Sequence, residues 1–213
     1  MLYWNTVNGL LKDCLIKLMQ AKELNNFRLV GGTALSLHLG HRISVDIDLF
    51  TDAEYGSVNF NLIEHFLLNT FNYVKGDFNS KPGMGNSYII GSDSENVVKL
   101  DLYYSMDPFF QDAEVIDGLR IATVEEIIAM KIDVVQRGGR KKDFWDLHEV
   151  LNTYSIKDMI DLHEKRYLWT HDKLLIQQNI TNFIEADFDP DPICLKGKYW
   201  IFIKEDIVEA VTQ

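Results

Sequence analysis

The sequence has little cysteine and no long apolar run. Its two cysteines, Cys14 and Cys194, are far apart and lack metal-ligand spacing, so we expect no disulfide framework, and a reducing cytoplasm fits. No apolar run reaches the roughly 18 residues needed for a membrane-spanning helix. Residues 1–5 lack the basic and apolar regions of a signal peptide. We therefore expect neither a membrane span nor a secretory leader.

Basic residues are outnumbered, with 21 Lys and Arg against 32 Asp and Glu and a net charge of −11. This balance argues against broad, nonspecific binding of nucleic acid, because such binding depends on neutralising phosphates. RNA could still be held by a local basic patch. The densest candidate is the segment 137–142, which has four cations in six residues. The alternative interpretation is a solvated loop between two helices.

Several common catalytic patterns are missing. The six histidines form no ligand cluster: there is no HExxH motif, and His38 and His41 have no partners at metal spacing. His163 and His171 are expected to be structural. Without a G-x-S-x-G motif or a Cys/His nucleophile pattern, a serine or cysteine hydrolase is not supported, and a Walker loop is also absent.

The most informative segment is VGGTALSLHLGHRISVDIDLF at residues 30–50. It joins a turn at Gly31 and Gly32, which opens a helix, to a strand that carries Asp46 and Asp48. Strand residues two apart share a face and lie roughly 6–7 Å apart, so both carboxylates can bracket a hard cation. The N–H groups of the turn and the positive end of the helix suit phosphate. A metal clamp beside a phosphate cradle is typical of phosphoryl or nucleotidyl transfer.

Either half of this segment is a weak signal by itself. Gly-Gly is common in turns, and an Asp-x-Asp pair at a strand edge is often only solvated. The combined order of strand, Gly-Gly turn, helix and Asp-x-Asp strand within about 20 residues is far more specific.

Hydrophobic periodicity predicts an α+β fold. Helices are expected at residues 5–24, 33–39, 59–70, 123–136, 140–151, 156–169, 172–184 and 199–211, and strands at 27–30, 45–50, 72–78, 87–90, 96–103 and 119–122, with a turn at 79–86. Thr33 is a candidate N-cap or early-turn residue, and Thr123 with Glu126 has the spacing of a capping box. We expect an N-terminal mixed-sheet core with flanking helices at residues 1–122 and a C-terminal helical bundle at 123–213. A ligand cleft is expected between them.

At these residues the chain resembles the nucleotidyltransferase AbiEii/AbiGii toxin family, part of the DNA-polymerase-β-like nucleotidyltransferase superfamily. The first motif of that superfamily is a Gly-Gly or Gly-Ser turn followed by Asp-x-Asp. The resemblance continues at VVKLDL (97–102), TVEEIIAMK (123–131) and RKKDFWDL (140–147). It covers about residues 27–150, and the rest matches only in being helical. Gly32 stands where many members carry serine, so a backbone N–H survives but a hydroxyl ligand to phosphate does not.

The resemblance implies a metal site and a set of catalytic residues. Asp46 and Asp48 would be joined by Asp101, on a neighbouring strand, to hold one or two Mg²⁺ ions. Lys131, in the family's Ala-Met-Lys motif, would reach the phosphates of the NTP substrate and complete the catalytic set. The alternatives are that Asp101 is an exposed strand residue paired with Lys99, and that Lys131 merely snorkels from an apolar helical face.

Two further aspartates, Asp143 and Asp146, stand three residues apart and so share a helical face. They could pair with Lys131, Lys142 or Arg140 and orient the cation. The rival interpretation is a pair of ordinary salt bridges on a helix surface.

Two residues that precede the aspartate pair complete the candidates. Arg42 could touch phosphate, and Ser44, on the face of Asp46 and Asp48, could contact the nucleotide or a metal-bound water or be a neutral filler. The predicted nucleotide-binding set is Gly31, Gly32, Thr33, Arg42, Ser44, Lys131, Asp143 and Asp146.

The resemblance implies a cytoplasmic, Mg²⁺-dependent enzyme that moves a nucleoside monophosphate from an NTP to a hydroxyl and releases pyrophosphate. It implies the toxin of a bacterial toxin–antitoxin or phage-defence pair, with RNA such as a tRNA 3′ end as acceptor and a cognate antitoxin as partner. One alternative is a small-molecule nucleotidyltransferase like the aminoglycoside-modifying enzymes, which the acidic composition favours. Another is a nucleotide-binding module with decayed catalysis, although the three aspartates and Lys131 argue against it.

Overall fold

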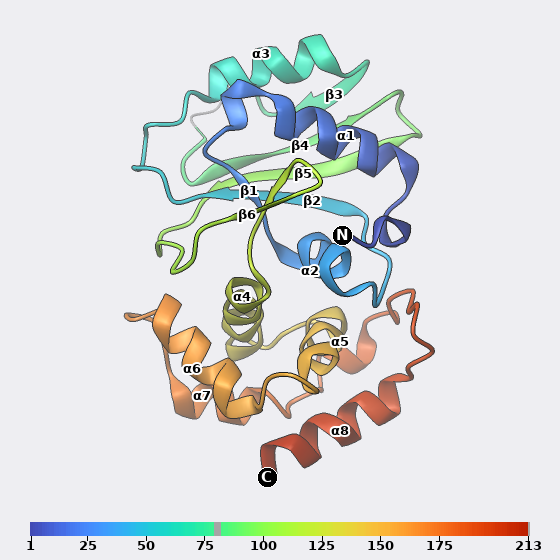
Figure 1. The fold of residues 1–213 in the computed structure, drawn as a ribbon, viewed down its shortest axis with the longest axis vertical. Coiled ribbons are helices and arrows are strands. Elements are labelled where there is room, and N and C mark those ends of the chain that lie inside the picture. The colour runs from blue at the N-terminus through green and yellow to red at the C-terminus, as the bar shows by residue number, and fades with distance from the viewer. Residues whose placement is uncertain (79–81, 213) are drawn as a thin grey trace.

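The computed structural model describes residues 1–78 and 82–212, and it places a mixed β-sheet beside a bundle of helices (Figure 1). The strands are β1 (Arg28–Leu29), β2 (Asp46–Thr51), β3 (Tyr73–Gly76), β4 (Gly85–Gly91), β5 (Val97–Tyr104), β6 (Glu114–Ile116) and β7 (Leu119–Ile121). Within the described residues they form one seven-stranded sheet in the order β3-β4-β5-β2-β1-β7-β6. The predicted α+β fold class is confirmed.

Strand β2 lies in the middle of the sheet, between β1 and β5. It runs parallel to β5 and antiparallel to β1, and its register sets Asp48 directly opposite Asp101. Ile47 and Leu49 are fully buried. Because side chains alternate along a strand, Asp46 and Asp48 lie on the other face of the sheet.

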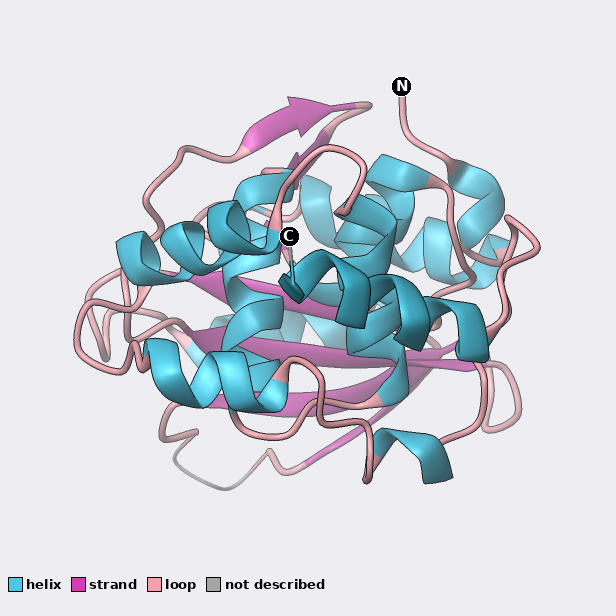
Figure 2. Ribbon diagram, turned by 90° about the horizontal axis from the view of Figure 1, so that it is seen from below, coloured by secondary structure: helices cyan, strands magenta, loops and turns pink. Residues whose placement is uncertain are grey.

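Helices cover both faces of the sheet. Figure 1 shows α1 (Gly9–Gln20) and α3 (Phe60–Thr70) on one face and α2 (Gly31–Leu39) on the other, and Figure 2, seen from below, shows helices in front of the strands. On the α2 side lie α4 (Val124–Gln136), α5 (Lys141–Val150), α6 (Ile156–Arg166), α7 (Lys173–Asn179) and α8 (Trp200–Thr212). Short 3₁₀ turns occur at Trp4–Thr6, Lys22–Leu24 and Ala186–Phe188. None of the helices in the described ranges is both long and apolar enough to cross a membrane.

Two hydrophobic clusters meet along α4. The first joins the sheet to the helices before it and includes Ile127, whereas the second begins at Ile128 and joins α4 to the following helices. Helix α4 therefore fastens the helical half to the sheet, directly after the position where the sequence predicts a domain boundary. The division into domains at 122/123 stays a prediction.

The structure corrects some of the predicted elements. Helix α2 begins at Gly31 with Val30 as N-cap, so of the two roles predicted for Thr33 the early-turn position is the one observed. The Thr123 hydroxyl does cap α4, where it accepts a hydrogen bond from the Glu126 backbone N–H. The Glu126 carboxylate, however, forms a buried ion pair with Arg166 at 2.7 Å.

Other differences lie at the ends of elements. Helix α7 ends at Asn179 instead of residue 184. The structure also contains the short strand β6, which the sequence did not predict because its residues show no alternating pattern. Of the turn predicted at 79–86, residues 79–81 lie outside the described residues.

Candidate active site

The aspartates of β2 face a cavity of about 330 Å³ between the sheet and the helical half, called here the inner cavity. Its walls come from α2, β2, α4, α5 and the segment after α6. They include Gly31, Gly32, Ser44, Asp46, Asp48, Phe50, Met130, Lys131, Asp133, Val134, Arg137, Arg140, Lys142, Asp143, Tyr167 and Val30. The expected cleft between sheet and helices is therefore present.

Two other carboxylates lie near Asp48: Asp46 at the same cavity and Asp101 on the neighbouring strand β5. Burial first, and then the charges of Asp101 and Asp46, raise the pKa of Asp48 to about 6, against partial relief from Lys131. Like charges that raise the pKa of Asp48 lie close to it. The negative charge would favour a bound cation, and carboxylate oxygens are the ligands that Mg²⁺ prefers.

Asp101 has two partners of its own. Its carboxylate accepts hydrogen bonds from the Lys99 ammonium at 2.5 Å and from the Ser87 hydroxyl at 2.6 Å. The Lys99 pair that the sequence offered as an alternative is thus present. In residues 1–78 and 82–212, no three His, Cys, Asp or Glu side chains gather into a group that could hold a metal ion. The Asp46, Asp48 and Asp101 metal site stays a prediction.

The glycine turn permits a very close approach of backbone to side chains. Gly31 has a φ of +69°, which favours glycine, and a Cβ there would lie 2.7 Å from Asp48 Oδ2. At Gly32 a Cβ would overlap the guanidinium of Arg42. The serine common in the superfamily would require Arg42 to move. The first-turn N–H groups of α2 have no partners within the helix, so they are available to an anion at this wall.

Lys131 lies in a buried network behind the cavity wall. Its ammonium is 2.6 Å from Asp143 Oδ1 and 2.7 Å from Asp146 Oδ2, and the lysine is only 6% exposed. The predicted pairing of Lys131 with both aspartates is confirmed by these distances. The two rival interpretations, snorkelling and surface salt bridges, are wrong because the groups are buried.

Asp146 is the centre of this network. It is fully buried and accepts two hydrogen bonds from Arg42, from Nε at 2.6 Å and from Nη2 at 2.8 Å. His41 Nε2 lies 2.8 Å from Asp146 Oδ1. The remaining Arg42 nitrogen donates to the Ile43 carbonyl, so Arg42 fixes the segment before β2 to α5. Its contact with phosphate stays a prediction.

Opposite charges decide the protonation states of the network. Burial by itself would lower the pKa of Lys131, but Asp146 and Asp143 outweigh it and raise the pKa. Burial would raise the pKa of Asp146, yet Lys131 and Arg42 hold it well below its usual range. Lys131 is therefore charged at neutral pH and fixed at the cavity wall by two ionised aspartates.

Thr33 and Ser44 connect α2 to the start of β2. Thr33 Oγ1 is 2.8 Å from Ser44 Oγ, and the Thr33 hydroxyl also bonds to the backbone carbonyl of Asp46. Ser44 lines the inner cavity with Asp46 and Asp48, as the alternation of the strand predicts. Thr33 thus holds the aspartate strand, whereas Ser44 is a polar group at the cavity itself.

The basic segment 137–142 divides into residues with different surroundings. Lys141 is buried, with its ammonium 2.9 Å from Asp191, so it is not a solvated cation. Lys142 lines the inner cavity and forms no ion pair within the described part of the chain. Burial, followed by the charges of Arg140 and Lys131, lowers the pKa of Lys142. An unpaired cation beside the carboxylates makes Lys142 a candidate ligand of the NTP phosphates, a role that the sequence analysis, which named it within the basic patch and as a possible partner of Asp143 and Asp146, did not predict.

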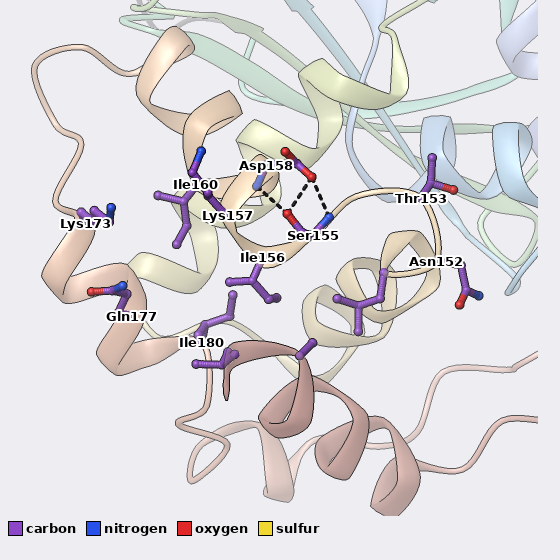
Figure 3. Close-up of a pocket in the computed structure, with 13 residues that line it drawn as sticks. Asn152, Thr153, Ser155, Ile156, Lys157, Asp158, Ile160, Lys173, Gln177 and Ile180 are labelled. Carbon is purple, nitrogen blue, oxygen red and sulfur yellow. Dashed lines mark hydrogen bonds between the residues drawn. The ribbon is translucent and has the colours of Figure 1, made fainter. Parts of the chain in front are cut away.

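A larger cavity of about 700 Å³ lies between α6, α7 and α8, away from the aspartates (Figure 3). Isoleucines such as Ile156 and Ile180 line it together with exposed lysines. Its single carboxylate, Asp158, is hydrogen-bonded to Ser155 in the capping box of α6. This space therefore lacks the clustered charges of the inner cavity.

Comparisons with known proteins give a family match and a related sequence. A family model described as nucleotidyl transferase AbiEii toxin, type IV toxin–antitoxin system, matches residues 13–213. An uncharacterized protein of Aquifex aeolicus is 28% identical over 160 residues, which is 73% of each chain.

Solved structures share the fold. JHP933 from Helicobacter pylori superposes with a TM-score of 0.61 at 18% identity, covering 99% of this chain and 90% of that one. MenT4, a nucleotidyltransferase toxin from Mycobacterium tuberculosis, superposes with a TM-score of 0.60 at 14% identity, covering 95% and 82%.

Proposed function

Because this chain belongs to the AbiEii nucleotidyl transferase toxin family and is a nucleotidyltransferase, we propose that it transfers a nucleoside monophosphate from an NTP to a hydroxyl of RNA, such as a tRNA 3′ end. We propose the inner cavity as the site, with Asp46, Asp48 and Asp101 as ligands of one or two Mg²⁺ ions. The observation that carries the proposal is the juxtaposition of Asp46 and Asp48 with the glycine turn of α2 and Lys131 around one cavity, with Asp101 opposite Asp48 on the neighbouring strand.

The residues around the inner cavity have different proposed roles in binding the NTP. The N–H groups of Gly31 and Gly32 and the cation of Lys142 would hold the triphosphate. Lys131 would supply a fixed positive charge, kept in place by Asp143 and Asp146. A preorganised charge of this kind stabilises a transition state without reorganising when charge develops.

The proposed transfer step needs no reactant besides the NTP and the acceptor hydroxyl. The acceptor oxygen forms a bond to the α-phosphorus, the bond between that phosphorus and the bridging oxygen to the β-phosphate breaks, and pyrophosphate leaves with the electron pair. The hydroxyl proton passes to one of the three carboxylates or to water. A bound Mg²⁺ would supply charge neutralisation at the phosphate oxygens.

The residues fit that ion in chemistry, because all three proposed ligands are carboxylates that repel one another when no cation is bound. Lys99 now holds one oxygen of Asp101. Its side chain is 48% exposed, so it can leave the carboxylate for solvent.

The proposal is tested by incubating the protein with each of the four NTPs, labelled on the α-phosphate, with Mg²⁺ and total RNA. We expect label in RNA, and none when the label is on the γ-phosphate, because that phosphate leaves in pyrophosphate. Parallel reactions with aminoglycosides instead of RNA test the small-molecule alternative. Binding of NTP without any transfer would support the decayed module.

We further propose that the protein is the toxin of a bacterial toxin–antitoxin or phage-defence pair, acts in the cytoplasm and has a cognate antitoxin. Family membership supports this role. Induced expression in a bacterial host should arrest growth for the wild type and not for Asp48→Asn. Equal growth of both strains at equal protein levels would contradict it.

A further inference from the structure

A second cavity of about 360 Å³, called here the outer cavity, adjoins the inner one. Four residues, Ser44, Asp46, Arg140 and Lys142, line both cavities. The two spaces therefore adjoin at these four residues, Asp46 among them. The proposed NTP site accounts for the inner cavity only, although a transferase must hold two substrates whose reacting atoms come together.

The far wall of the outer cavity is the segment 189–193, which precedes α8, and it is firmly anchored. The Ile43 backbone N–H donates to the Ile193 carbonyl at 2.9 Å. Lys141 donates from its backbone N–H to Asp189 at 3.0 Å and from its ammonium to Asp191 at 2.9 Å. The wall is thus fixed both to the segment that enters β2 and to the first turn of α5.

The lining of the outer cavity combines exposed apolar groups with cations. Val45 is 61% exposed and Ile193 is 68% exposed. Arg140 and Lys142 supply positive charge, and the lining also holds the carboxylates of Asp46, Asp189 and Asp191. Asp191 is paired with the Lys141 ammonium, and Asp189 accepts a hydrogen bond from the Lys141 backbone N–H. An apolar surface next to cations suits a flat base joined to a phosphate.

On the basis of the proposed nucleotidyl transfer, we propose that the outer cavity holds the 3′-terminal nucleotide of the RNA acceptor. The base would pack on Val45 and Ile193, and the phosphate would lie at Arg140 and Lys142. The terminal hydroxyl would then reach Asp46, which lines both cavities.

The test uses Ile193→Glu, since this side chain is exposed and the substitution adds negative charge to the apolar wall. The matched control is Leu174→Glu, at an α7 position that is 71% exposed and lines neither cavity. Binding of an RNA with a 3′-deoxy end is measured by fluorescence anisotropy, and binding of a nonhydrolysable NTP by calorimetry. The KM for RNA is measured separately.

We expect Ile193→Glu to weaken RNA binding and raise the KM for RNA about tenfold or more, because the base loses an apolar contact and the RNA phosphate gains a repulsive charge nearby. NTP binding should not change, and the control should match the wild type in both assays. Val45→Asn, on the opposite wall, should weaken RNA binding in the same direction, so the inference does not depend on the folding of one variant.

Two outcomes separate this inference from the proposed function. If the wild type modifies RNA and both variants bind and modify it equally well, the outer cavity is not the acceptor site, while the proposed transfer stands. If the wild type transfers nucleotide to no RNA, the proposed function fails and the acceptor site fails with it.

Discussion

Substitution of Asp48 by asparagine should make the metal-free protein more stable while it removes activity. Burial and the charges of Asp101 and Asp46 raise the pKa of Asp48 from 3.8 to about 6. A carboxyl whose pKa is higher in the folded state opposes folding once it ionises. The difference of about 2 units corresponds to about 3 kcal/mol at most, at 1.36 kcal/mol per unit.

The sign of this effect depends on pH. Below about pH 4, Asp48 is protonated in both folded and unfolded chains, so the asparagine variant should gain nothing. As the pH rises from about 4 to above 6, the wild type loses stability through Asp48, and the variant's advantage should grow to about 1–3 kcal/mol and then stay constant.

The assay is urea unfolding in EDTA at a series of pH values, with Asp161→Asn as the control. Asp161 is an exposed partner of Lys157 in an i,i+4 pair, so its loss should cost well under about 1 kcal/mol at every pH. If the Asp48→Asn variant is less stable than the wild type at pH 7.5, the ionised Asp48 carboxylate does not destabilise the folded wild type, and the reasoning is refuted.

Three further predictions concern the same site. Asp46→Asn should lower the rate of transfer about 100-fold or more with an unchanged unfolding midpoint, measured by label transfer beside urea unfolding. Asp146→Asn should lower the free energy of unfolding by about 3–5 kcal/mol, because Arg42 and Lys131 lose a buried counter-charge. A loss below about 1 kcal/mol would show that the pairing of Asp146 with Arg42 and Lys131 does not stabilise the fold. Lys142→Ala should weaken both NTP and RNA binding. It should also reduce the salt dependence of RNA modification, since phosphate contacts release counterions. An unchanged salt dependence would show that Lys142 does not contact phosphate.

The sequence predicts well what depends on neighbouring residues. Strand alternation correctly placed Ser44, Asp46 and Asp48 on one face, and helical spacing correctly placed Asp143 and Asp146 on one side of α5. Both patterns follow from local backbone geometry.

Long-range contacts carry no such signal. His41 pairs with Asp146 across 105 positions, and Lys141 pairs with Asp191 across 50, so neither partner could be read from spacing. The sequence does not distinguish the four cations of the basic segment from one another. In the structure Lys141 is buried next to the start of α8, whereas Lys142 is not buried. The second cavity was equally hidden, because its far wall lies more than 140 residues after Asp46.

The most direct test of the proposed site is a crystal structure with a nonhydrolysable NTP and Mn²⁺ in place of Mg²⁺. Anomalous scattering should locate the manganese between Asp46, Asp48 and Asp101, with Lys99 withdrawn from Asp101 and the triphosphate beside Gly31, Gly32 and Lys142. Manganese and triphosphate bound elsewhere, with the Lys99–Asp101 pair intact and the inner cavity empty, would contradict the assignment of this cavity as the site of nucleotidyl transfer.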